Sequence, residues 1–246
     1  MNKELQNVQN TWHKLGEDDP YWAVLSDPSK RGNKWNKDEF FLNGKKGVDA
    51  VIKEIEIKNF RIKKKKALDF GCGIGRLTRT LSFHFDEVIG VDIAPSMIGH
   101  ARKLNSDFAN CEFVVNANDD LAFIDDNSID LIYSSITLLH IPPTITLNYL
   151  KEFIRVIEPN GVCVCQIPYG KDWTLKGIAF KFMTPSLFSY FHRLRYKSEV
   201  GMEVHTIPYK KVKMSIENSG GRIDSIVEDK SAGEGWDCFK YFITKN

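Results

Sequence analysis

A glycine-rich turn between an apolar strand-like run and a helix is the feature of this sequence that most constrains its fold. Within residues 67–78, three glycines stand at alternate positions, Gly71, Gly73 and Gly75. Glycine lets the backbone bend sharply and approach a ligand without an intervening Cβ atom. The helix that follows offers unpaired N–H groups in its first turn. The turn therefore predicts a binding site for part of a nucleotide-like molecule.

The spacing of the glycines distinguishes this turn from the usual NAD-binding turn. The NAD fingerprint is Gly-x-Gly-x-x-Gly. Here the third glycine comes one position early, and Arg76 occupies the place where the NAD pattern needs glycine. The turn alone is a weak signal, so its meaning depends on the segments around it.

Strand-like and helix-like segments alternate along most of the chain. This alternation predicts a parallel sheet with right-handed crossovers and helices on both faces. Ligands of such sheets bind beyond the carboxyl ends of the strands. Apolar runs predict strands at 67–70, 88–91, 113–115, 129–133, 162–167, 222–227 and 238–244. Helical spacing predicts helices at 48–55, 76–85, 95–104, 143–157 and 208–218. A turn is predicted at 158–161.

Length and composition favour one domain. With 246 residues and 42% hydrophobic content, the chain can bury the core of one sizeable α/β domain. Within that domain, residues 1–46 form an aromatic N-terminal cap of short helices. Residues 47–169 form the cofactor-binding core, 170–207 an aromatic and basic insertion that acts as a substrate lid, and 208–246 a closing helix and two strands.

Charge and cysteine content set the expected partners and location. A formal net charge of +2 gives no electrostatic reason to expect a nucleic acid or a membrane surface as partner. The five cysteines are odd in number and lack Cys-x-x-Cys spacing, so we interpret them as reduced core residues. Because neither a signal peptide nor a membrane-spanning run is present, we expect a cytoplasmic protein.

Asp92 is the second residue expected to bind a ligand. It ends the second predicted strand, 21 residues after Gly71. In open α/β sheets an acid at this place accepts hydrogen bonds from ribose hydroxyls beside the glycine turn. The same feature occurs in NAD-binding folds, and an acid that merely starts the helix near Pro95 is the structural alternative.

Several segments resemble a known family. Asp69 followed by Gly71-x-Gly73-x-Gly75 resembles motif I of the class I, Rossmann-like S-adenosylmethionine-dependent methyltransferases. Residues 130–135 followed by 138–141 resemble the fourth strand and the next loop of that family, and 19–25 and 232–236 look similar to a bacterial group with methyltransferase domains of types 11 and 25. The resemblance implies a doubly wound, seven-stranded, mostly parallel sheet with an antiparallel last strand.

The resemblance also implies the cofactor, S-adenosylmethionine, with S-adenosylhomocysteine as product. At the place where the family carries an acid for the adenine amino group, this chain has Ala117, which leaves Asn118, Asp119 or backbone groups for that contact. The cofactor-binding residues that it implies are Asp69, Gly71, Cys72, Gly73, Gly75, Asp92, Ile93, Met97, Asn118, Asp119 and Ser134.

Methyl transfer from a sulfonium needs a collinear arrangement in a dry site and few catalytic groups. An oxygen acceptor must also lose a proton to a general base. His140 and His205 are the candidate bases, and for each a purely structural role remains open. We expect a metal-independent methyltransferase for a small molecule, acting as a monomer or homodimer; an oxygen acceptor is preferred, and nitrogen and carbon acceptors remain open. The alternatives are an NAD-type oxidoreductase and a non-catalytic protein that binds S-adenosylmethionine.

Overall fold

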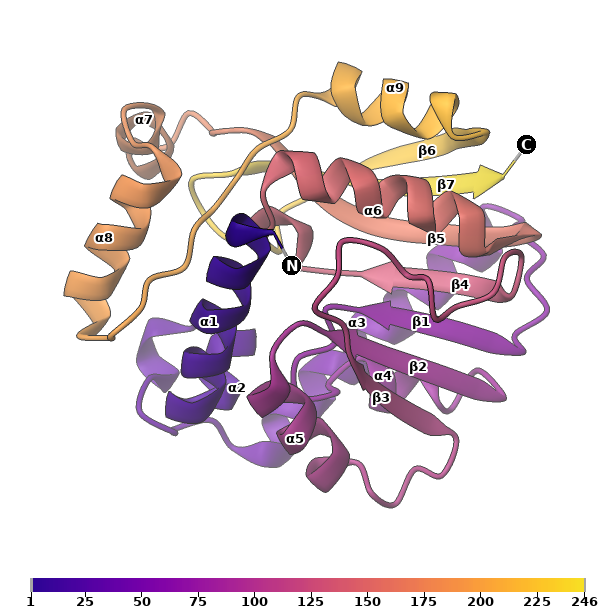
Figure 1. The fold of residues 1–246 in the computed structure, drawn as a ribbon, viewed down its shortest axis with the longest axis horizontal. Coiled ribbons are helices and arrows are strands. Elements are labelled where there is room, and N and C mark those ends of the chain that lie inside the picture. The colour runs from indigo at the N-terminus through magenta and orange to yellow at the C-terminus, as the bar shows by residue number, and fades with distance from the viewer. Residues whose placement is uncertain (1, 246) are drawn as a thin grey trace.

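One sheet with strand order β3-β2-β1-β4-β5-β7-β6 organises the computed structural model, which describes residues 2–245 (Figure 1). Strand β7 pairs antiparallel with both β5 and β6, whereas the other pairs are parallel. The predicted sheet is therefore confirmed. The strands are β1 (Lys66–Phe70), β2 (Glu87–Asp92), β3 (Cys111–Val115), β4 (Ile129–Ser134), β5 (Ile157–Gly170), β6 (Gly221–Asp229) and β7 (Asp237–Lys245).

Helices cover both faces of the sheet, as predicted. Helices α6 (Pro143–Val156) and α9 (Tyr209–Asn218) pack their apolar residues on one face, together with Leu68 and Ile132 of the central strands. Helix α3 (Lys37–Ile57) and α4 (Thr78–Leu81) pack on the other face. Because β1 and β4 are covered on both faces, their residues are almost continuously buried.

Two elements of the core differ from the prediction. The helix expected over 76–85 is reduced to α4, because i→i−3 hydrogen bonds tighten the chain on both sides of it, such as Thr80 N to Leu77 O at 2.9 Å and His84 N to Leu81 O at 2.8 Å. The turn expected at 158–161 lies within the long strand β5.

The N-terminal segment begins with one long helix, α1 (Lys3–Asp18), where short helices were expected. Asn2 caps it by accepting a hydrogen bond from Glu4 N at 2.7 Å. Then come the short α2 (Pro20–Val24) and η1 (Pro28–Lys30), and α3 runs through the expected boundary between 46 and 47.

Helix α1 is fastened across the carboxyl ends of the parallel strands. Gln9 Nε2 donates to Ile93 O at 3.0 Å, and Ser96 Oγ donates to His13 O at 2.7 Å. These bonds join α1 to the end of β2 and the start of α5 (Pro95–Leu104). In Figure 1, the arrows of β1 and β4 point toward α1. The N-terminal segment thus covers the edge where ligands of such sheets bind.

The insertion after β5 contains two helices, α7 (Leu175–Lys181) and α8 (Pro185–Tyr196), which stand beyond α1 at the left of Figure 1. Their inner side chains contact the N-terminal segment, as in the pair of Tyr196 and Trp22, whose ring centroids are 4.7 Å apart. No helix among the described residues is both long enough and apolar enough to span a bilayer.

Candidate active site

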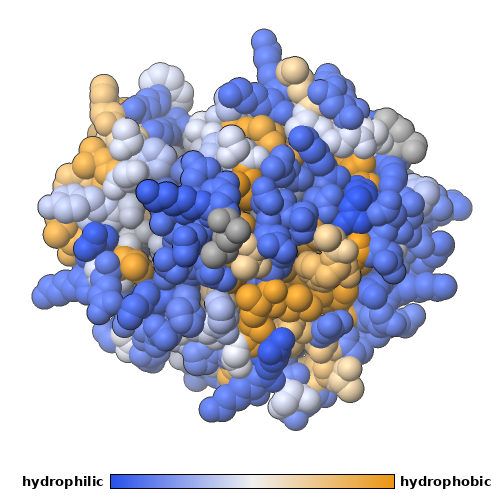
Figure 2. All heavy atoms as spheres, viewed as in Figure 1, coloured by the Kyte–Doolittle hydropathy of each residue, from blue (hydrophilic) through white to orange (hydrophobic). Residues whose placement is uncertain are grey.

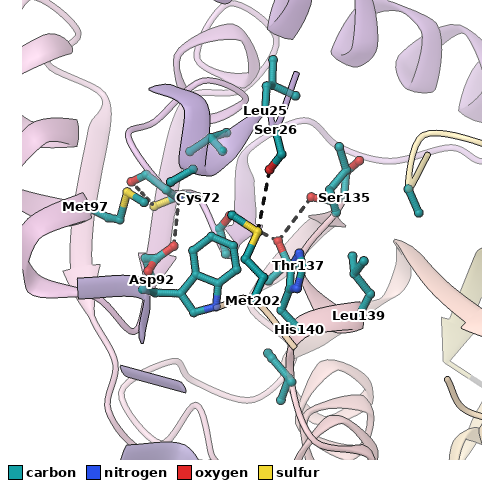
Figure 3. A pocket seen from close by; sticks show the side chains of 18 of the residues that line it. Leu25, Ser26, Cys72, Asp92, Met97, Ser135, Thr137, Leu139, His140 and Met202 are labelled. Atoms are coloured by element: carbon teal, nitrogen blue, oxygen red, sulfur yellow. Dashed lines mark hydrogen bonds between the residues drawn. The ribbon is translucent and has the colours of Figure 1, made fainter. Parts of the chain in front are cut away.

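A cavity of about 500 Å³ lies at the carboxyl ends of β1, β2 and β4. Small-molecule sites commonly range from about 300 to 1,000 Å³. The walls come mainly from six parts of the chain: the N-terminal segment, the glycine turn, the end of β2 with the start of α5, the loop after β4, the insertion, and the loop between β6 and β7. Figure 3 shows Cys72, Asp92 and Met97 on one side of the cavity and Ser135, Thr137, Leu139 and His140 on the other.

The glycine turn forms one wall and brings neighbouring segments close. Gly71 and Gly73 have positive φ angles of 78° and 53°. A Cβ atom on Gly71 would overlap the Thr137 side chain, and one on Gly73 would lie 2.6 Å from Val24 Cγ2. Any larger residue at either place would push apart the walls of the cavity.

Asp92 lines the cavity beside this turn. Its carboxylate accepts hydrogen bonds from Gly73 N and Ala94 N, each at 2.9 Å. Burial raises the pKa of this carboxyl group, and the two backbone donors oppose that shift. The predicted residues Cys72, Ile93 and Met97 line the same part of the cavity.

Arg76 is a buried cation in the wall of the cavity, with only 5% of its surface exposed. Its Nη1 donates to Asn43 Oδ1 at 2.9 Å, while its buried Nε finds no hydrogen-bond partner among the described residues. Burial lowers the pKa of its guanidinium. In the sequence, Arg76 stands out only as the residue at the position where the NAD pattern needs glycine; a basic residue directly after the turn is the signal for its role in the site.

His140 ends the short helix η2 (Leu138–His140) and lines the cavity. Its Nδ1 lies 2.7 Å from Glu203 O, so the Nδ1–H group donates and Nε2 keeps a free lone pair. The Trp12 ring meets the imidazole edge-on, with centroids 4.9 Å apart. Burial lowers the pKa of His140 to about 4. The neutral imidazole is therefore the form present at neutral pH.

His205, the other candidate base, lines a separate cavity of about 210 Å³. Its backbone N donates to Leu139 O at 2.8 Å, and its Nε2 lies 3.3 Å from Glu203 Oε2. Burial lowers the pKa of its imidazole, although the Glu203 carboxylate opposes that shift. Of the two histidines, the structure brings His140 to the large cavity.

The remaining predicted residues lie outside the cavity lining. The Asp69 carboxylate is fully buried, accepts from Thr78 Oγ1 at 2.6 Å, and has its pKa raised to about 6 by burial. Ser134 Oγ donates to Phe70 O at 3.0 Å. Asp69 thus bonds the Thr78 side chain after the turn, and Ser134 bonds the backbone before it. Gly75, Asn118 and Asp119 also lie outside the lining.

Three residues of α8 that the sequence interpretation did not assign to the site face the cavity: Phe188, His192 and Tyr196. They recur every four residues and therefore share one helix face. His192 Nδ1 is buried and has no hydrogen-bond partner among the described residues. Burial lowers the pKa of this imidazole to about 4. The four-residue spacing was the signal that could have separated His192 from the surface residues of the insertion.

Comparison with solved structures identifies the fold. The chain aligns with magnesium protoporphyrin IX methyltransferase from Synechocystis, solved with bound S-adenosylhomocysteine, at a TM-score of 0.63 and 15% identity, covering 97% of this chain and 98% of that one. The sheet order and the antiparallel β7 thus belong to the Rossmann-like fold of class I methyltransferases.

Sequence comparison finds similarity to methyltransferases over part of the chain. Residues 67–161 match a family model described as "Methyltransferase domain". A demethylmenaquinone methyltransferase of Staphylococcus saprophyticus is 35% identical over 118 residues, 47% of this chain and 48% of that protein. One from Staphylococcus carnosus is 29% identical over 67% of this chain and 58% of that protein. The matches thus span about half the length of these relatives. Residues 67–161 are thus similar to a methyltransferase domain, and the chain has the fold of the class I methyltransferases.

Proposed function

We propose that this chain transfers a methyl group from S-adenosylmethionine to a small molecule. The observation that carries the proposal is one cavity that joins the glycine turn and Asp92 to the free Nε2 of His140. The domain match and the methyltransferase names of the relatives support the same activity. The glycine spacing disfavours NAD as the cofactor.

The residues present fit this cofactor. The buried, partly unpaired Arg76 supplies a cation for its carboxylate, and Asp92 supplies acceptors for both ribose hydroxyls. The glycine turn has no room for a Cβ atom at Gly73, which would lie 2.6 Å from Val24 Cγ2, so its backbone lines the cavity directly. When bound, the cofactor supplies an activated methyl group on a positively charged sulfur.

For the acceptor we propose an oxygen nucleophile on a largely apolar small molecule. The lining of the cavity also includes Trp12, Phe188 and Trp236, which offer flat apolar surfaces and exclude water. His140 Nε2 accepts the proton of the hydroxyl, and Glu203 O holds the ring in the tautomer that permits this. The name shared by the relatives supports a small-molecule acceptor.

The activity is tested with purified protein, methyl-labelled S-adenosylmethionine and matched pairs of phenols and anilines that carry the same apolar substituents. We expect label in the phenols and one S-adenosylhomocysteine formed for each methyl transferred. Label only in the anilines would refute the oxygen acceptor. Thermal stabilisation by NADH but not by S-adenosylhomocysteine would refute the methyltransferase itself. Tight cofactor binding without transfer to any acceptor in an extract of the source cells would indicate a non-catalytic binder.

We expect the Arg76→Met variant to bind S-adenosylhomocysteine roughly 10- to 100-fold more weakly, since a hydrogen bond to a charged group contributes about 1.5–3 kcal/mol. Its affinity for adenosine, which lacks the carboxylate, stays unchanged. Calorimetric titration of both ligands measures this difference. Arg79→Met is the matched control, because Arg79 packs over the Phe41 and Phe108 rings at 4.6 and 4.7 Å, outside the cavity lining. An equal loss for adenosine would contradict the assignment.

A further inference from the structure

The outer side of the insertion exposes an unusual concentration of large apolar side chains. Of the fourteen exposed large hydrophobic residues in the described part of the chain, eight fall within residues 173–194. Trp173, Leu175 and Phe182 are 83%, 89% and 84% exposed. Figure 2 shows hydrophobic residues at the left edge of the molecule, where α7 and α8 lie in Figure 1. The other five are Ile178, Leu187, Tyr190, Phe191 and Leu194.

Helix α8 has two apolar faces with different surroundings. Phe188, His192 and Tyr196 face the cavity. On the outside, Leu187, Tyr190, Phe191 and Leu194 follow the spacing i, i+3, i+4 and i+7 and form one exposed stripe. An apolar stripe of this kind on a helix that already packs on the protein with its other face indicates a surface that binds something.

The charges of the insertion indicate the chemistry of the partner that binds this apolar surface. Residues 173–198 contain five lysines and arginines and no aspartate or glutamate, although the whole chain carries a net charge of only +2. Arg193, Arg195 and Lys197 are exposed beside the apolar stripe. Lys181 Nζ lies 3.2 Å from the centroid of the Trp173 ring. Exposed aromatic and aliphatic residues flanked by basic ones are the composition of helices that lie in the interface of an anionic bilayer.

We propose that α7 and α8 dock on the surface of an anionic lipid bilayer. The apolar stripe enters the boundary between headgroups and acyl chains, and the basic residues bind anionic headgroups. Given the proposed function, the same helix then connects the bilayer to the cavity, so the acceptor is a lipid-dissolved molecule. The net charge of +2 gave no reason to expect a membrane surface as partner. That total conceals the basic segment, because acidic residues elsewhere in the chain balance it.

Flotation of the 246-residue chain with vesicles tests the docking without requiring methyl transfer. We expect the protein to float with phosphatidylglycerol vesicles at about 50 mM salt, and at least tenfold less with phosphatidylcholine vesicles or at about 500 mM salt, where charges are screened. The combined variant Tyr190→Ser, Phe191→Ser and Leu194→Ser loses flotation. The control Ile57→Ser with Met214→Ser, which changes residues 68% and 61% exposed on other helices, keeps it.

The same preparations are tested for S-adenosylhomocysteine binding by thermal shift, which separates failure of docking from failure of the proposed function. Wild-type protein that binds the cofactor but does not float with phosphatidylglycerol overturns the docking. Equal flotation of the triple variant also overturns it. A dimer in sedimentation that the triple variant abolishes, together with no flotation, assigns the stripe to a second copy of this chain and likewise overturns the proposal. Flotation of a protein that binds no S-adenosylhomocysteine supports docking and refutes the proposed cofactor.

Discussion

Replacing His140 with asparagine lowers kcat for an oxygen acceptor by roughly 100- to 10,000-fold, the range typical for loss of a general base. Asparagine keeps a donor for Glu203 O, to which His140 Nδ1 now donates over 2.7 Å, so the loop after β4 retains its hydrogen bond. Affinity for S-adenosylhomocysteine stays within about twofold. Initial rates and calorimetry on the same preparation separate the two effects.

The pH profile gives a second test of His140. Its pKa is lowered from 6.5 to about 4, so the neutral, proton-accepting form predominates above that value and is lost as the pH falls through about 4. Titration of His140 therefore causes no loss of kcat/KM between pH 8 and 5 in the wild type.

His205→Asn is the control for His140→Asn, since His205 lines the smaller cavity. The kcat of the His205→Asn variant stays near the wild-type value. A large loss in His205→Asn with none in His140→Asn would assign the base to His205.

The second large effect concerns the cofactor. We expect Asp92→Ala to weaken S-adenosylhomocysteine binding by at least about 100-fold, because two hydrogen bonds from ribose hydroxyls to a charged acceptor are lost. The change also removes the acceptor for Gly73 N and Ala94 N, so the glycine turn loosens. Titration calorimetry measures the affinity, and thermal unfolding measures the accompanying loss of stability.

Asp130→Ala separates these two consequences of losing Asp92. Asp130 is a buried carboxylate that also accepts two backbone hydrogen bonds, from Lys65 N and Lys66 N at 2.8 Å, but it does not line the cavity. We expect Asp130→Ala to lower the melting temperature and to leave cofactor affinity unchanged. Equal affinity losses in both variants, or unchanged affinity in Asp92→Ala, would count against the ribose assignment.

The sheet could be predicted because its signals are local. Continuous apolar runs predict strands buried on both faces, and the spacing of Val48, Val51, Ile52 and Ile55 predicts a helix face; all four are buried in α3. Asp92 could be placed beside the glycine turn for the same reason, since a parallel crossover fixes the end of one strand against the next. The predicted range of the helix over 76–85 was wrong, because i→i−3 hydrogen bonds replace the α-helical bonds on both sides of α4.

The candidate site was only partly predictable, because its members come from distant segments. His140 and His205 look alike in sequence, and only packing sends one to the large cavity and the other to the small one. Arg76 is buried because the helix that contains Gly44 approaches it closely enough that a Cβ there would lie 2.6 Å from Arg76 Cγ. Because short helices were expected in the N-terminal segment, the long helix α1 and the contact of its Trp12 with His140 were not predicted.

By itself, the sequence determined the sheet, the glycine turn and the carboxylate at its side, since backbone freedom and apolar periodicity act between neighbouring residues. Only the tertiary structure decided which side chains share the cavity and which face outward. The two faces of α8 show why: Phe188 and Phe191 are the same residue type three positions apart, yet one lines the cavity and the other is 47% exposed. Burial depends on what packs against a helix, and that surface comes from residues far away in the chain.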